Sequence, residues 1–508
     1  MAGPRPDWQT LQSALDGEVV LPGSPAYDEA TTPFNARFHH VRPRAVVRCG
    51  TPQDVAETIW FVTRHGLEAV PRGGGHCFAG HSSTRGVVID VAPMHAVHVA
   101  EGVATVGAGA RLGDLYEALQ TDGLTIAGGT CPNVGIAGLT LGGGLGILGR
   151  KHGLTCDKLI AAEVVIADGR VLSCDEDHNE DLFWALRGAG AGNLGVVTSF
   201  VFRTVPAPRA TNFHVAWPHI RAAAAIEAWQ SWAPRGPDEL ATSLKITTTD
   251  HIDRPPSVDV YGAFLGERSD AEGLLGTLVA RVGADPSWCW LDSLSFTETR
   301  RFWAQLPTAG DHAGTGPPPE ETEYPYFVSK SEFFGRPLPS EAIGLLLETF
   351  SRARVRGAAR ELDFMPWGGA YNRVPAHATA FVHRDELFQL KHSVVVDPEA
   401  STTVKHAALR HVQESWASVH RWGSGRVFPN FADPDLDQWA DAYYGSNQGR
   451  LLQVKARYDP GGFFHPPPGR SDGSSPSLAL IVHEKRVAEG VDLDEIARTA
   501  SLRPDDPG

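Results

Sequence analysis

The strongest chemical feature of the sequence is a histidine that ends a run of three glycines, Arg72-Gly73-Gly74-Gly75-His76. Glycines let the backbone bend tightly and bring its N–H groups against a phosphate-bearing ligand. The histidine is thereby placed beside whatever the loop binds. Taken alone, this stretch fits a plain glycine turn followed by a surface histidine at least as well as a binding loop.

Two further glycine-rich segments change that balance. Residues 128–138 read GGTCPNVGIAG, with Cys131 in the middle, and residues 141–146 read LGGGLG. A third approach, residues 188–197, reads GAGAGNLGVV and runs into a predicted strand. So many glycines bring the backbone close to a flat, extended ligand. Three such loops together require a large cofactor.

Common nucleotide, hydrolase and metal motifs do not account for these loops. Two stretches match GxGxxG, at residues 144–149 and 190–195. The nicotinamide fingerprint needs a strand before it and a helix directly after it, and neither stretch has this context. No P-loop, GxSxG or HExxH occurs, and the six cysteines form neither a CxxC pair nor a zinc spacing. We therefore predict no metal site and, apart from Cys131, reduced cysteines that pack as small apolar side chains.

The motifs as a set resemble the berberine bridge enzyme family, which belongs to the vanillyl-alcohol-oxidase type of flavoproteins. The resemblance rests on the glycine–histidine loop, the GGTCPNVG segment, the GNLGVVTSF strand and the C-terminal stretch from Asn430 to Pro460. It implies an α+β, two-domain fold in which residues 1–208 and 426–470 form a PCMH-type FAD-binding domain. A substrate domain of antiparallel sheet covered by helices is then inserted at residues 209–425, and residues 471–508 form a tail.

The resemblance also implies how FAD is held. In members with two anchors, the histidine after the glycine loop bonds the flavin 8α carbon and the cysteine bonds C6, which here implies His76 and Cys131. Imidazole and thiolate are good nucleophiles toward an electron-poor flavin. Val134 stands where a small or valine side chain lets oxygen reach the reduced flavin. The other predicted FAD-binding residues are Arg72, Gly73, Gly74, Gly75, Gly80, His81, Gly135, Gly138, Gly142, Gly143, Gly144, Gly195, Val197 and Asn447.

We therefore predict an FAD-dependent oxidase. Hydride would pass to flavin N5 from an alcohol, hemiacetal or amine carbon of a sugar or specialised metabolite, and O2 would be reduced to H2O2. One alternative is an oxidative cyclase of a natural-product precursor, which product analysis would separate. Others are a flavin-binding protein without turnover and a nicotinamide-dependent reductase, which rapid bleaching by NADPH would favour.

Three positions depart from the family pattern. The residue after the C-terminal Asn430 is often a tyrosine that accepts the substrate proton, and here it is Phe431. Trp367 replaces a second tyrosine before the paired glycines. Phe78 replaces a tyrosine two residues after the predicted flavin-bonding histidine. Either another base has taken over, or the substrate is an amine or an acidic phenol that needs less proton removal.

Three residues are the predicted replacement bases. On an extended segment Tyr371 would face the same side as Trp367, because side chains two apart share a face. Glu332 lies on a predicted strand, where it shares a face with Lys330, and His383 follows an apolar run. Each also fits a purely structural role, because a base needs hydrogen-bond reach and a suitable pKa, which the sequence does not supply.

The elements that must position these residues change in character along the chain. The first part alternates strand and helix signals, with a helix from Pro52 that Thr51 caps and that ends at Gly66. Hairpins at residues 97–106 and 162–171 favour an α+β domain over a run of parallel crossovers. The second part interleaves predicted helices (220–232, 270–282, 340–352, 405–419) with strands (257–264, 326–333, 361–364), which favours helices on one face of an antiparallel sheet.

Composition bounds the class of protein. A chain of 508 residues is expected to form two domains, and its net charge of −15 argues against nucleic-acid binding. The start lacks a basic, apolar signal sequence, and no apolar run reaches membrane-spanning length, so we expect a cytoplasmic protein. Its expected partners are a small-molecule substrate and O2, and it is expected to be a monomer or homodimer. The tail is rich in Ser, Pro, Asp and Arg and contains one possible helix at residues 492–500.

Overall fold

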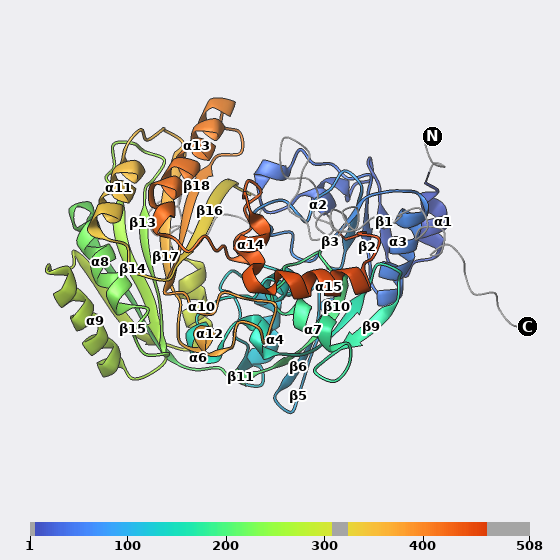
Figure 1. The fold of residues 1–508 in the computed structure, drawn as a ribbon, viewed down its shortest axis with the longest axis horizontal. Helices are drawn as coiled ribbons and strands as arrows, with labels where there is room; N and C mark the ends of the chain where they lie inside the picture. The colour runs from blue at the N-terminus through green and yellow to red at the C-terminus, as the bar shows by residue number, and fades with distance from the viewer. Residues whose placement is uncertain (1–5, 307–323, 465–508) are drawn as a thin grey trace, which may run out of the picture.

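The computed structural model describes residues 6–306 and 324–464, so the predicted tail and its helix lie outside the described residues. The chain forms two assemblies that lie side by side (Figure 1). One contains the N-terminal strands together with the last two helices. Its core runs from Leu11 to Phe464, while a separate core from Phe213 to Val419 holds the other assembly. Segments from both ends of the chain thus share one core.

The first sheet of the N-terminal assembly is mixed. Its helix α3 (Pro52–Arg64) begins at a capping box between Thr51 and Asp54, as the sequence predicts. Two of its strands run parallel to a third, so this sheet contains parallel pairs besides an antiparallel one. The strand order is β1 (Glu18–Val20), β2 (Ala45–Arg48), β4 (Val87–Asp90) and β3 (Ala69–Arg72).

The second sheet of this assembly is antiparallel and confirms both predicted hairpins. The first hairpin turns at Glu101-Gly102, where both residues have positive φ, 51° and 76°, as a two-residue type I′ turn requires. The second turns around Gly169. The strand order is β5 (Val97–Ala100), β6 (Val103–Gly107), β10 (Val196–Arg203), β8 (Leu159–Val165) and β9 (Val171–Cys174).

Short helices complete this assembly. The C-terminal helix α15 packs against α7, so the end of the described chain returns to the N-terminal core (Figure 1). Two short strands, β7 (Leu124–Thr125) and β11 (Val205–Pro206), pair with each other. The helices are α4 (Leu112–Gln120), α5 (Ile136–Leu141), α6 (Gly149–His152), α7 (Glu180–Leu186), α14 (Trp439–Tyr444) and α15 (Gln448–Tyr458).

The other assembly is a seven-stranded antiparallel sheet with helices on one face, as predicted (Figure 1). Leu244, Leu362 and Leu390 of its central strands pack under those helices. The strand order is β15 (Trp288–Leu294), β12 (Ala210–Pro218), β14 (Ser257–Phe264), β13 (Leu240–Thr247), β17 (Ala358–Pro366), β18 (Phe388–Val396) and β16 (Tyr326–Phe334). The covering helices are α8 (Ala222–Trp232), α9 (Arg268–Val282), α11 (Ser340–Ser351) and α13 (Thr402–Val419).

The described residues contain neither a candidate membrane-spanning helix nor a candidate metal-binding group. Within residues 6–306 and 324–464, no helix is both long and apolar enough to cross a membrane. The same ranges hold no group of three or more His, Cys, Asp or Glu side chains arranged to bind a metal ion.

Candidate active site

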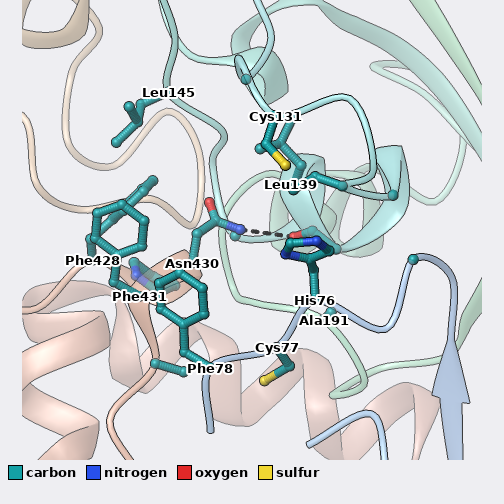
Figure 2. A pocket seen from close by; sticks show the side chains of 18 of the residues that line it. His76, Cys77, Phe78, Cys131, Leu139, Leu145, Ala191, Phe428, Asn430 and Phe431 are labelled. Carbon is teal, nitrogen blue, oxygen red and sulfur yellow. Dashed lines mark hydrogen bonds between the residues drawn. The ribbon is translucent and has the colours of Figure 1, made fainter. Parts of the chain in front are cut away.

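A cavity of about 640 Å³ lies between the two assemblies. The glycine-rich loops form one side of it, and the uncovered face of the seven-stranded sheet contributes residues from β13, β17 and β18 to the other. His76 and Cys131 both line this cavity (Figure 2). A cavity of this size and mixed lining is typical of a cofactor or small-molecule site.

The loops that carry His76 and Cys131 contact each other through two glycines. A Cβ atom on Gly74 would lie 2.3 Å from the backbone nitrogen of Gly135, and one on Gly135 would lie 2.4 Å from that of Gly74. No larger residue fits at either position without separating the loops. The glycines therefore bring two residues that are far apart in the chain into one wall of the cavity.

His76 is held in a defined orientation. Its ring stacks on Phe34, with centroids 3.9 Å apart and planes 19° apart. Burial, with a smaller contribution from Arg111, lowers the pKa of His76 to about 4. The imidazole is therefore neutral near pH 7, and it keeps the lone pair that a nucleophile needs.

Cys131 differs from the sequence expectation in its protonation. Burial raises the pKa of its thiol, although the backbone N–H groups of Asn133 and Val134 partly oppose this. The isolated side chain is therefore a thiol near neutral pH and not the thiolate assumed from the sequence. Those two N–H groups would stabilise the thiolate once the proton leaves.

The structure places most of the predicted FAD-binding residues in the cavity wall, but not all. Gly80 packs against Phe38, and Gly143 packs against Phe381, so neither reaches the cavity. Gly144 lies beside Thr155 and is likewise outside the lining. Those that line it are Arg72, Gly73, Gly74, Gly75, His76, His81, Cys131, Val134, Gly135, Gly138, Gly142, Gly195 and Val197.

Several buried polar atoms in this wall have no hydrogen-bond partner within the described chain. They are one terminal guanidinium nitrogen of Arg72, Nε2 of His81 and the hydroxyl of Ser82. Buried polar groups normally have partners, so unmet ones facing a cavity indicate a polar ligand. Together with glycine loops that leave no room for side chains, they fit a large phosphate-bearing cofactor such as FAD.

Asn430 belongs to the site, although the sequence reasoning used it only as part of a motif. Its amide nitrogen donates to the carbonyl of Gly138 at 2.9 Å, and its amide oxygen accepts from the N–H of Gly144 at 3.0 Å (Figure 2). It thus fastens the C-terminal segment to the glycine loop. Asn447, predicted at the flavin's polar edge, instead donates to the carbonyls of Ala376 and Thr379 and lies outside the cavity lining.

The three aromatic replacements, Phe78, Trp367 and Phe431, all line the cavity, but they belong to two groups of stacked rings. Phe78 stacks on Phe431 with centroids 5.5 Å apart, and it also packs against Phe327 at 4.8 Å. Phe78, Phe327 and Phe431 together form an apolar wall of the cavity. Trp367 stacks on Tyr371 in a neighbouring aromatic cluster.

Tyr371 is not on a strand, contrary to the sequence prediction. Gly368 and Gly369 both have positive φ, which ends the extended backbone, and Tyr371 lies in the short helix α12 (Ala370–Arg373). Its ring lines the cavity, but its hydroxyl points at the carbonyl of Gly146, 3.4 Å away. Burial raises the pKa of that hydroxyl far above its usual range, which makes it a poor base.

Glu332 and His383 do not reach the cavity. Glu332 is paired across the strands with Leu390, whose side chain packs under the helices, so it faces away from the cavity. There its carboxylate is hydrogen-bonded to the His420 ring and accepts a hydrogen bond from the N–H of Gly425. His383 is fully buried against Phe333 and Phe381, and burial lowers its pKa to about 3.

Charged side chains that sequence reasoning missed lie on the cavity face of the sheet. Lys245, Glu361, Asp363 and Lys391 all line the cavity, from β13, β17 and β18. Lys391 is 3.2 Å from Glu361 and 3.5 Å from Asp363, and Lys245 is 3.4 Å from Glu361. The period-two alternation of charged and apolar residues in Glu-Leu-Asp-Phe, residues 361–364, was the available signal.

Comparisons with known proteins agree with this arrangement. Residues 43–175 match an FAD binding domain and residues 427–469 match the berberine and berberine-like family. The chain is 32% identical over 462 residues to the uncharacterized FAD-linked oxidoreductase YvdP of Bacillus subtilis, covering 89% of this chain and 97% of that protein. It is 31% identical to berberine bridge enzyme-like 3 of Arabidopsis thaliana, covering 85% and 84%.

A solved structure gives the same fold. The glucooligosaccharide oxidase of Acremonium strictum superimposes with a TM-score of 0.79 at 26% identity, covering 92% of this chain and 98% of that one. The cofactor named for that oxidase is a 6-S-cysteinyl, 8α-N1-histidyl FAD.

Proposed function

The chain belongs to the berberine bridge enzyme-like family of FAD-linked oxidoreductases, and we propose that it is an oxidase whose FAD is bound covalently by both His76 and Cys131. One observation carries the proposal. Two nucleophilic side chains, on loops whose glycines touch, line one cavity, and the wall around them is glycine-rich backbone. The doubly attached flavin named for the Acremonium strictum oxidase supports it.

The chain's own residues divide the work of holding the cofactor. Neutral His76, fixed against Phe34, presents a lone pair, and Cys131 presents sulfur beside two backbone N–H groups. Arg72 and His81 offer unused N–H groups or lone pairs to polar parts of the cofactor. When bound, FAD supplies the capacity to accept a hydride and to pass the electrons to oxygen.

The substrate is a small molecule that enters between the Phe78–Phe431 wall and the charged face of the sheet. An alcohol, hemiacetal or amine carbon fits a cavity with one apolar and one polar side. The same site would serve an oxidative cyclase, and the product, an isomer of the simple oxidation product, would reveal it.

The oxidase assignment is tested at Val134, which lines the cavity. The flavin is photoreduced in the absence of substrate and mixed with oxygenated buffer, and its reoxidation is followed by absorbance. The wild-type flavin is expected to reoxidise rapidly. The Val134→Leu flavin is expected to reoxidise at least about tenfold more slowly, because the longer side chain fills the oxygen path. A tenfold change in rate corresponds to a change of about 1.4 kcal/mol in the activation free energy.

Val134→Ala is the matched control, since it enlarges the same position and is expected to react as fast as wild type. Slow reoxidation of wild type would contradict an oxidase and favour a dehydrogenase. Equal rates for the leucine and alanine variants would remove Val134 as the gate.

A further inference from the structure

Three of the four charged residues on the cavity face of the sheet, which we call the charged floor, form a row across four strands together with Asp259. Lys391 pairs in register with Asp363, Asp363 with Lys245, and Lys245 with Asp259. The signs therefore alternate along one row, and Glu361 lies between the two lysines, close to both. The strands come from distant parts of the chain, so the pattern exists only in the folded protein.

This cluster is too costly to be explained as a stabilising device. Side chains of Lys245, Glu361, Asp363 and Lys391 are 10%, 3%, 8% and 13% exposed. Desolvating four charges offsets most of their mutual attraction, and apolar residues would stabilise such a position equally well. The members that face the cavity carry two positive and two negative charges, so their sum is zero.

The two carboxylates have different surroundings. Both lysines contact Glu361, which lowers its pKa to about 2 against the effect of burial, so Glu361 is a fixed counter-ion. Asp363 accepts a hydrogen bond from Ser243 on one oxygen and approaches Lys391 at 3.5 Å with the other. Among the described residues, Asp363 is thus ion-paired with one lysine, whereas Glu361 is ion-paired with two.

Two further observations place a ligand here. The hydroxyl of Ser393, on the strand position opposite Glu361, is buried, lines the cavity and has no partner among the described residues. The ammonium group of Lys391 lies 5.4 Å from the ring centroid of Phe431, the residue that replaces the usual tyrosine base. The charged residues therefore begin directly beside Phe431.

We propose that Lys245, Glu361, Asp363 and Lys391 form the polar end of the substrate site, that this site takes a neutral alcohol with an apolar ring face, and that Asp363 accepts the proton of its hydroxyl. The inference rests on the proposed function. A neutral hydroxyl can donate to Asp363 and accept from Lys391 or Ser393 without adding a buried charge. The Phe78, Phe327 and Phe431 wall packs against its carbon skeleton.

The reaction balances with the cofactor class already named. The O–H proton moves to a carboxylate oxygen of Asp363, and the electron pair of that bond forms the second carbon–oxygen bond. The hydrogen on the same carbon leaves with its electron pair and is accepted by oxidised FAD. The alcohol becomes a carbonyl compound, and Lys391 and Ser243 hold Asp363 toward the hydroxyl.

Binding tests the charge balance without the natural substrate. The flavin-containing protein is titrated near neutral pH with cumyl alcohol, protonated cumylamine or benzoate, and dissociation constants are read from the flavin absorbance change. The alcohol's tertiary carbon has no hydrogen to lose, so no turnover occurs. Wild type is expected to bind the alcohol most tightly. Asp363→Asn should shift the benzoate-to-cumylamine preference about tenfold toward benzoate, and Lys391→Met about tenfold toward cumylamine, because each leaves one unpaired charge.

Two controls keep the result interpretable. Glu341→Gln removes an exposed carboxylate on the helix-covered side and should change none of the affinities. The double variant Asp363→Asn/Lys391→Met restores neutrality, so it should fold where a single variant is unstable and should again prefer the alcohol. An unchanged affinity order in both single variants, or shifts in the same direction, would overturn the charge-balanced site.

The proton acceptor is tested by screening alcohols for anaerobic flavin reduction. With an alcohol that reduces the wild type, Asp363→Asn is expected to slow reduction about 100-fold or more while cumyl alcohol still binds. Equal reduction rates, or a library in which only amines reduce the flavin, would overturn the proposal. The reduction experiment is done without oxygen, and it does not depend on whether the flavin is covalently attached. Its outcome is therefore distinguishable from a failure of the oxidase assignment or of the covalent assignment.

Discussion

The double variant His76→Ala/Cys131→Ala is expected to release all of its flavin on acid precipitation, whereas wild type and both single variants keep a yellow pellet. The two residues lie on different loops, and each is proposed to bond a different flavin atom, so either bond alone retains the cofactor. The glycine contact between the loops keeps both residues in place when one side chain is truncated. Absorbance of pellet and supernatant, with the intact mass of the protein, measures the outcome.

Cys77→Ala is the matched control, because this cysteine is adjacent to His76 and lines the same cavity. It is expected to behave as wild type. Flavin in the wild-type supernatant would show that attachment is not covalent. Loss of flavin from one single variant would show a single bond through the residue that was removed.

Lys455→Met is expected to lower the free energy of unfolding by about 3–5 kcal/mol, because it breaks a fully buried ion pair on one side only. Lys455 and Asp459 are both 0% exposed, and their charged groups are 2.6 Å apart. The same ammonium group donates to the carbonyls of Asn193 and Phe464. It therefore joins the C-terminal helix to the third glycine-rich loop. Its loss leaves the buried Asp459 carboxylate without its cation, with only the backbone N–H groups of Phe463 and Phe464 as donors, and removes a donor from two carbonyls.

The measurement is urea unfolding followed by circular dichroism, with flavin absorbance as a second signal for the loop. Arg457→Met, two residues further along the same helix, is the control. The arginine of its pair with Asp181 is 65% exposed, so solvent screens the pair and the substitution is expected to change the free energy of unfolding far less than Lys455→Met does. Equal effects of the two substitutions would contradict a special role for the buried lysine.

Local chemistry explains what could be predicted from the sequence. Glycine runs have few uses other than close backbone approach, so the loops around His76 and Cys131 were recognisable one by one. Helix α3 carries its start signals in Thr51 and Pro52, and the turn at Glu101-Gly102 requires residues that tolerate positive φ. Amphipathic spacing likewise predicted helices on one face of the second sheet. The family assignment followed from the order of these local motifs.

The sequence could not place the predicted replacement bases, because long-range geometry decides which side chains reach the cavity. Alternation along a strand shows which residues share a face with Glu332 or with Lys391. It does not show which of the two faces the helices cover. The two glycines before Tyr371 could end a strand or continue it, and only their positive φ values decided that.

The charged residues on the cavity face of the sheet could not be predicted for the same reason. Lys245, Asp363 and Lys391 are up to 146 residues apart in the sequence, and they meet because β13, β17 and β18 are neighbours in the sheet. Strand order depends on which apolar surfaces bury one another across the whole domain, which no local pattern contains. The sequence by itself therefore determined the glycine-rich loops and the family, while the tertiary structure alone decided which polar side chains line the cavity.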